Sequence, residues 1–260
     1  MILTPAIYYV MAAVLGLLFG SFASLAAHRI PLGEPVVTGH SRCPRCRHAL
    51  GIGDLVPVFS YARAKGKCRY CAAAISLRYP IIEITTAVLF MMALAAAGAG
   101  VNAILLGLLA LGLVIITIID LEHQIIPDQV SLALAGLGVA YRFLPGSGGD
   151  AWLSAAMGAV TGFSIAWALR LIFQKLKGRE ALGFGDVKFF AVAGLWTGLG
   201  ELADFMLLSG LAGILFAAGW RLRGRDAVFP FGPALAAGLL AVVLLNASGM
   251  PQPLSLLFIR

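Results

Sequence analysis

Long apolar stretches, separated by short polar or glycine-rich breaks, fill most of the chain. Eight of them are each close to the ~20 residues that an α-helix needs to cross the hydrocarbon core of a bilayer. Their approximate limits are 6–27, 80–99, 101–120, 128–144, 151–173, 186–200, 203–220 and 230–247. One sizeable polar segment, His28 to Arg78, separates the first stretch from the second. The pattern predicts an all-α polytopic membrane protein with about eight transmembrane helices and one small polar insertion.

Composition agrees with a membrane protein. Of the 260 residues, 60% are hydrophobic and 12% are charged, and the mean hydropathy is +0.94, whereas about a quarter of the residues in a soluble domain are charged. The apolar start has no basic residue before it, so we expect a retained first helix and not a cleaved signal peptide. A net charge of +7 could suggest binding to nucleic acid. In a membrane protein, however, the placement of Lys and Arg around the bilayer matters more than their sum. We therefore expect a lipid partner and no nucleic acid.

The basic residues predict the orientation of the helices. They gather in 28–78, in 170–188 and in 221–225, and eight spans place all three segments on one side. The opposite side keeps Arg142 and Arg260. Cytoplasmic loops carry the excess of Lys and Arg, so the basic side is predicted to be cytoplasmic, with both termini on the other side.

All four cysteines of the chain lie in the polar segment, as two C-x2-C pairs separated by 21 residues. They are Cys43, Cys46, Cys68 and Cys71. Two such pairs supply a complete tetrahedral shell for a structural zinc ion, although the spacing is slightly wider than in a usual zinc ribbon. A reducing cytoplasm disfavours two disulfides, and the other alternative is a reduced cluster without metal. We predict three regions: a first helix (1–27), a cytoplasmic zinc-ribbon-like domain (28–79) and a membrane domain (80–260).

Asp120 and Asp186 each lie at the predicted cytoplasmic end of a span. Asp186, in "LGFGDVKFF", has the position of a helix N-cap, and Asp128 has the same position at the start of the fourth span, where we expect capping. Asp120 is different, because it ends the third span, where the helix dipole disfavours a negative charge. Ionisable residues at this depth are functional candidates.

Two carboxylates on one membrane face suit aspartic-protease chemistry. If Asp120 and Asp186 come close, one holds a proton while the other stays charged. The charged one activates a water and the protonated one donates to the developing oxyanion. An alternative is a small transporter with a zinc module that uses both acids and Lys188 as a proton relay. Transporter sites, however, lie near the bilayer midplane between repeated halves, and no repeat is evident here. A non-enzymatic assembly factor would leave Asp120 unexplained.

Five motifs follow one another along the chain. They are "GSFASLAAHRIP", "SRCPRCRHAL" with "KCRYCAAAISLRYPIIE", "IIDLEHQIIPD", "GFGDVK" and "PFGPALAAG". In this order they resemble the prepilin peptidases, or type IV leader peptidases, which are membrane aspartic proteases with a Gly-x-Gly-Asp motif. The resemblance covers nearly the whole chain, and it implies that Asp120 and Asp186 are the catalytic pair.

The resemblance also implies a bifunctional enzyme of the bacterial inner (plasma) membrane. Its substrates would be type 4 prepilins or pseudopilins, whose basic leader is removed on the cytoplasmic side. The new N-terminal residue would then be methylated with S-adenosylmethionine. The family usually has an asparagine where Ser24 stands, so a peptidase without methyltransferase activity is the alternative. No residue for the methyl donor can be assigned from the sequence. For Glu83, a cation or a backbone group is the expected partner.

Overall fold

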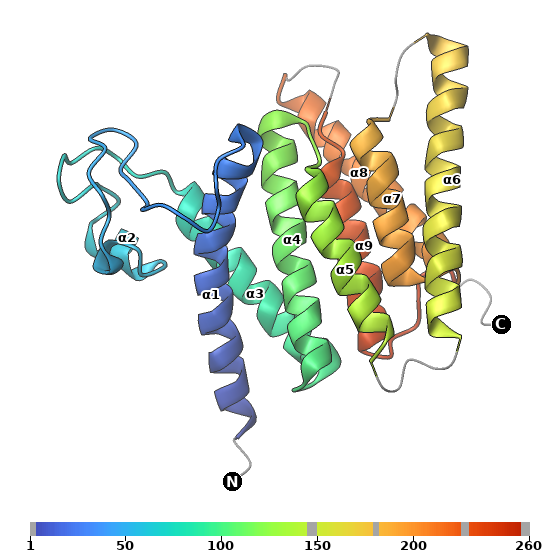
Figure 1. Ribbon diagram of the computed structural model, residues 1–260, viewed down its shortest axis with the longest axis horizontal. Helices are drawn as coiled ribbons and strands as arrows, with labels where there is room; N and C mark the ends of the chain where they lie inside the picture. Colours follow the sequence, from blue (N-terminus) through green and yellow to red (C-terminus); the bar gives the residue numbers. More distant parts are fainter. Residues whose placement is uncertain (1–3, 145–149, 179–181, 225–228, 256–260) are drawn as a thin grey trace. The chain divides into compact units, whose positions relative to one another are not determined.

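The computed structural model describes residues 4–144, 150–178, 182–224 and 229–255 (Figure 1). Within these ranges the chain is helical, with turns and two isolated β-bridges and no β-strand. Of the basic residues used to predict the orientation, Arg179, Arg225 and Arg260 lie outside the described residues.

A helix forms at each of the eight predicted positions. These helices are α1 (Pro5–Arg29), α3 (Arg78–Ala97), α4 (Val101–His123), α5 (Asp128–Arg142), α6 (Ala151–Lys177), α7 (Phe184–Thr197), α8 (Leu202–Leu222) and α9 (Gly232–Ala247). Five of them, α1, α3, α4, α6 and α8, are long and apolar enough to cross a membrane. The all-α membrane fold is therefore confirmed.

The other three helices are shorter than a full crossing. Helices α5, α7 and α9 have 15, 14 and 16 residues. At about 1.5 Å per residue they fall short of a hydrocarbon core of about 30 Å. The prediction of eight spans thus holds for the positions of the helices, whereas three of the helices are shorter than a spanning helix.

By packing, the chain divides into two compact units, Met1–Ile115 and Ile116–Arg260, and the division falls inside α4. This division differs from the three regions expected from the sequence, which stay a prediction. The first unit contains the cysteine pairs, and the second contains Asp120 and Asp186.

In the first unit, α1 and α3 touch backbone to backbone. A Cβ atom at Gly16 would lie 2.4 Å from the Cα of Ala87, and one at Gly20 would lie 2.6 Å from the Cα of Glu83. This is a G-x-x-x-G contact, in which small residues let two membrane helices approach closely. Ala23, on the same helix, is fully buried.

The segment between α1 and α3 has almost no core. It contains two short 3₁₀ helices, η1 (Ile30–Leu32) and η2 (Ile52–Asp54), and the short helix α2 (Phe59–Arg63). Bridges between Arg42 and Ala49 and between Lys67 and Ala74 flank the two cysteine pairs. From residue 28 to 79, all of which the structure describes, the buried residues are Cys43 and Cys68. The cysteines therefore occupy the place that an apolar core has in a larger domain.

In the second unit, α7 is the central helix. It packs against α5, α6, α8 and α9, and Figure 1 shows it beside α6. Its side chains Val187, Phe189, Ala193 and Trp196 are at most 1% exposed. Because α7 is surrounded by protein, it does not need to span the lipid on its own, and its N-terminus carries Asp186.

Glycines set the spacing of α6 and α7. A Cβ atom at Gly158 would lie 2.3 Å from the carbonyl oxygen of Gly194, and one at Gly194 would lie 2.1 Å from that of Gly158. A Cβ atom at Gly162 would lie 2.5 Å from the carbonyl oxygen of Phe190. No side chain fits between the two backbones.

We therefore predict that Gly194→Ala destabilises the protein, because the added methyl group overlaps the backbone of α6. The expected loss is about 1–3 kcal/mol, as for other overpacked cores. The measurement is the thermal unfolding midpoint of the purified protein in detergent. Gly210→Ala in α8 is the matched control, since a Cβ atom there meets nothing within 4 Å. Equal midpoints for the two variants would contradict this account of the packing.

Candidate functional site

Asp120 lies in the last turn of α4 and is 4% exposed. Its Oδ2 atom accepts a hydrogen bond of 2.6 Å from the backbone N–H of Gly232, the first residue of α9. The first N–H groups of a helix have no partner within that helix and attract negative charge. A Cβ atom at Gly232 would come within 2.7 Å of the same oxygen, so a glycine is required there. The N-terminus of α9 thus offsets the unfavourable position of Asp120 at the end of α4.

Asp186 is the third residue of α7, whose N-cap residue is Gly183. The Oδ2 atom of Asp186 accepts a hydrogen bond of 3.0 Å from the N–H of Gly183. This is the reciprocal bond of a capping box, in which a side chain three residues into the helix satisfies the N–H of the cap residue. The bond holds the carboxylate at the start of the central helix of the unit.

The structure brings the two aspartates into one neighbourhood within the second unit. The charge of Asp120 acts on the carboxylate of Asp186, as does the charge of Arg170. The backbones around them also approach closely, because a Cβ atom at Gly185 would lie 3.4 Å from the backbone nitrogen of Ile126. The end of α4, the turn that follows it and the start of α7 therefore meet, as the two-carboxylate hypothesis requires. The catalytic role of the pair stays a prediction.

Asp128 does not cap α5, and this expectation was wrong. The N-cap residue is Pro127, and Asp128 is the first residue of the helix. Its two carboxylate oxygens instead accept hydrogen bonds of 2.7 and 2.9 Å from Nζ of Lys188. The same nitrogen lies 4.6 Å from the centre of the Phe184 ring. Lys188, the fifth residue of α7, therefore connects this helix to the first turn of α5, a contact that the sequence did not reveal.

The remaining polar residues around the pair are at the surface or brace a loop. Glu122 and His123 are exposed, as expected for the turn after Asp120. The guanidinium of Arg170 donates a hydrogen bond of 2.8 Å to the carbonyl of Leu182, just before the Gly-x-Gly-Asp segment.

The four cysteines come together in the first unit. The four Sγ atoms all lie within 4.8 Å of one another. Those of Cys43 and Cys71 are 3.9 Å apart. None is in a disulfide. Backbone N–H groups of Cys46 and Arg45 lower the pKa of Cys43 to about 6, whereas burial and hydrogen bonds with the other three thiols raise the pKa of Cys71 to about 11. Metal binding requires the thiolate form of each cysteine. The cluster fits a tetrahedral Cys₄ site with Zn–S distances of about 2.3 Å.

A cavity of about 800 Å³ lies in the first unit, lined by α1, α3 and the cysteine segment. Glu83, 6% exposed, lines it and accepts a hydrogen bond of 2.7 Å from the N–H of Val58. A backbone group is thus the partner of Glu83, as expected. Ser24 lines the same cavity, which the sequence did not predict. The only signal was the helical spacing of Ser21, Ser24 and His28 along α1.

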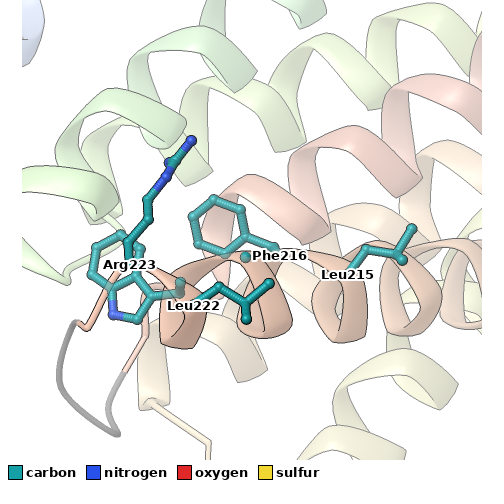
Figure 2. A pocket seen from close by; sticks show the side chains of 6 residues that line it. Leu215, Phe216, Leu222 and Arg223 are labelled. Carbon is teal, nitrogen blue, oxygen red and sulfur yellow. The ribbon is translucent and has the colours of Figure 1, made fainter.

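A second hollow, of about 440 Å³, lies along the last turns of α8. Figure 2 shows Leu215, Phe216 and Leu222 along the helix and Arg223 extending from its end. Its lining contains neither aspartate and only one charged side chain. An apolar helix face ending in an arginine is typical of a helix end in contact with lipid.

Two models of known protein families match the chain. The model of the bacterial peptidase A24 N-terminal domain matches residues 14–97, which include the four cysteines, and that of the type IV leader peptidase family matches residues 107–218, which include both aspartates.

Curated relatives named prepilin leader peptidase/N-methyltransferase are similar over most of the chain. The one from Aeromonas salmonicida is 33% identical, over 92% of this chain and 91% of the relative. The one from Neisseria gonorrhoeae is 36% identical, over 86% of each. The one from Pseudomonas putida is 34% identical, over 92% of this chain and 91% of the relative. No solved structure matches the chain.

Proposed function

Because the chain belongs to the type IV leader peptidase family, we propose that it removes the short basic leader of type 4 prepilins or pseudopilins. We propose that it then N-methylates the new N-terminal residue with S-adenosylmethionine. The observation that carries the peptidase half is the neighbourhood of Asp120 and Asp186. The carboxylates come from two different helices, and each is held by the backbone N–H at the start of a helix.

In the proposed reaction, the two aspartates act as one acid–base unit. Because each disfavours ionisation of the other, one carboxyl group keeps its proton while the other is charged. The charged carboxylate takes a proton from a water molecule as the water oxygen bonds to the carbon of the scissile peptide. The protonated carboxyl donates to the carbonyl oxygen. When the tetrahedral species collapses, the C–N bond breaks and a proton passes to the departing amine.

The placement of the pair fits a substrate that is half in the membrane. Asp120 lies in the last turn of an apolar helix and Asp186 in the first turn of another. We propose that this edge faces the cytoplasm of a bacterial inner-membrane protein, because the distribution of Lys and Arg along the sequence predicts that the end of α4 and the start of α7 lie on the basic side. A basic leader would then stay in the cytoplasm while the apolar helix of the pilin lies in the bilayer, and the scissile bond would lie at the level of the aspartates.

We further propose that the four cysteines bind a structural zinc ion. The support is their common neighbourhood, together with the lack of any other buried residue in 28–79. A four-thiolate shell leaves no open coordination position, so the ion would hold the segment together without taking part in the reaction.

The zinc proposal predicts about one zinc ion per chain in elemental analysis of protein purified without chelators. Replacement of all four cysteines by serine should abolish the bound metal. It should also make the segment between α1 and α3 sensitive to limited proteolysis, because that segment lacks an apolar core. Full protease resistance of the serine variant, or metal-free native protein, would contradict the proposal.

The two activities are predicted to separate. Leader removal needs only the carboxylates and water, so it should proceed at an unchanged rate without S-adenosylmethionine and leave a free, unmethylated N-terminus. Mass spectrometry of the product, with and without the methyl donor, provides the measurement. A strict requirement of cleavage for S-adenosylmethionine would contradict two separate sites. A product that is never methylated would leave only the peptidase half.

Asparagine at either Asp120 or Asp186 should lower the rate of cleavage by at least about a thousandfold, the scale expected when a core acid–base group is lost. Asparagine keeps the size of the side chain and can still accept the hydrogen bond from Gly232 or Gly183. It cannot share a proton, so the water is not activated. The measurement is cleavage of one prepilin at matched levels of each variant in membranes.

Two control variants separate this effect from a general effect of losing a carboxylate. Asp204 is 4% exposed, like Asp120, and accepts a hydrogen bond from Leu254; Asp204→Asn should keep most of the activity. Asp128→Asn should do so as well, because an exposed ion pair contributes only about 0–1 kcal/mol. Robust cleavage by Asp120→Asn or Asp186→Asn would remove the two-aspartate mechanism.

A further inference from the structure

The cavity of the first unit has a polar, buried inner wall and a basic, exposed outer wall. Ser21 and Ser24 of α1 and Glu83 of α3 form part of the inner wall. The outer wall is formed by the cysteine segment and includes the exposed residues Arg42, Arg63 and Lys67, together with Arg69, which pairs with Asp54. Its volume of about 800 Å³ lies within the range of about 300–1,000 Å³ of small-molecule sites.

Glu83 is held at the inner wall by contacts with α1 and with the segment before α2. Its Cα lies where Gly20 lets α1 approach α3. The carboxylate receives hydrogen bonds from the N–H of Val58 and from the hydroxyl of Ser21. Both are neutral donors, and no ion pair of Glu83 is found among the described residues. A buried charge is costly unless it is paired, and a cationic ligand would supply the missing partner.

Val58 is held in an unusual conformation to make this contact. Its φ is +59°, in the left-handed region that a β-branched residue rarely adopts. Since α2 starts at the next residue, Phe59, this turn aims the N–H of Val58 at Glu83. Backbone strain of this kind persists where the surroundings hold it, and it is concentrated at functional sites.

Ser24 supplies a second, independent observation. It is 5% exposed, it lines the cavity, and its Oγ atom has no hydrogen-bond partner among the described residues. Buried hydroxyl groups nearly always have a partner. The inner wall therefore offers an unused hydrogen-bonding group and, in the same cavity, a buried acidic group without a cationic partner.

We propose that this cavity is the binding site of the sulfonium methyl donor, with Glu83 as the negative charge for the sulfonium and Ser24 as a hydrogen-bonding group for the same ligand. The inference rests on the proposed N-methyltransferase function and assigns it a place. When bound, S-adenosylmethionine supplies a methyl group on a positively charged sulfur. The ligand is also zwitterionic, so its own carboxylate suits the arginines and the lysine of the outer wall.

The test compares S-adenosylmethionine with S-adenosylhomocysteine, which has the same groups but lacks the methyl group and the positive charge. Affinities are measured by titration calorimetry on the purified full-length protein in detergent. Glu83→Gln should weaken binding of S-adenosylmethionine by at least about tenfold, the scale of a lost charge-assisted contact, and binding of S-adenosylhomocysteine by less than about threefold. Ser24→Ala should weaken both ligands to a similar degree.

Two further measurements separate failure of this site from failure of the proposed function. Asp186→Asn should bind both ligands as the wild type does, and Glu83→Gln should still cleave prepilin, which also shows that it is folded. If wild type binds the donor but Glu83→Gln and Ser24→Ala bind it equally well, this site is wrong while the methyltransferase function stands. If wild type binds no donor, both are overturned.

Should Glu83→Gln fail to fold, photo-crosslinking of radiolabelled S-adenosylmethionine to wild type replaces the variant. Label in peptides from residues 21–83, and its loss on competition with excess unlabelled donor, is the expected result. Label confined to residues 116–260 would overturn the assignment.

Discussion

The second unit depends on one hydrogen bond, from the N–H of Gly232 to the carboxylate of Asp120. A carboxylate buried at the C-terminal end of a helix faces carbonyl groups of the same sign as its own charge. The free-energy cost of this burial is offset when the N-terminus of another helix lies beside the carboxylate and donates a hydrogen bond to it. Helix α9 does so, and its first residue must be glycine because a Cβ atom would overlap Asp120. The positions of α4 and α9 are therefore fixed by the residue proposed to carry the chemistry.

Close packing through glycine holds the rest of this arrangement in place. Between helices in lipid there is little hydrophobic driving force, so contact and backbone approach must provide the stability. Gly158 and Gly194 let α6 and α7 touch, and α7 is then enclosed by four other helices. Enclosure explains why a helix of 14 residues can stand inside a membrane protein, since its ends meet protein and not hydrocarbon. It also keeps Asp186 in place at the N-terminus of α7.

The sequence predicted the helices and the cysteine cluster well, because hydrophobic runs and C-x2-C spacing are local signals. It also singled out Asp120 as a functional candidate from its unfavourable position at the end of a helix. The hydrogen bond that compensates this position was not predicted, since Gly232 lies 112 residues further along the chain. The ion pair of Asp128 with Lys188 spans 60 residues, and the contact of Val58 with Glu83 spans 25. Capping was therefore the wrong choice for Asp128. A local pattern reports that a polar group must be satisfied, whereas only the packing of distant segments decides by what.

The chemistry of the substrate also fixes the order in which the two proposed sites act. Before cleavage, the nitrogen to be methylated belongs to a peptide bond, where resonance with the carbonyl group withdraws its lone pair. It becomes an amine, and hence a nucleophile, only after the aspartates have broken that bond. Methyl transfer must therefore follow proteolysis even though Glu83 and the aspartates belong to different units of the chain. A methyl-donor site made of other residues than the peptidase site fits this order, because cleavage then needs no donor, whereas methylation can act only on the cleaved product.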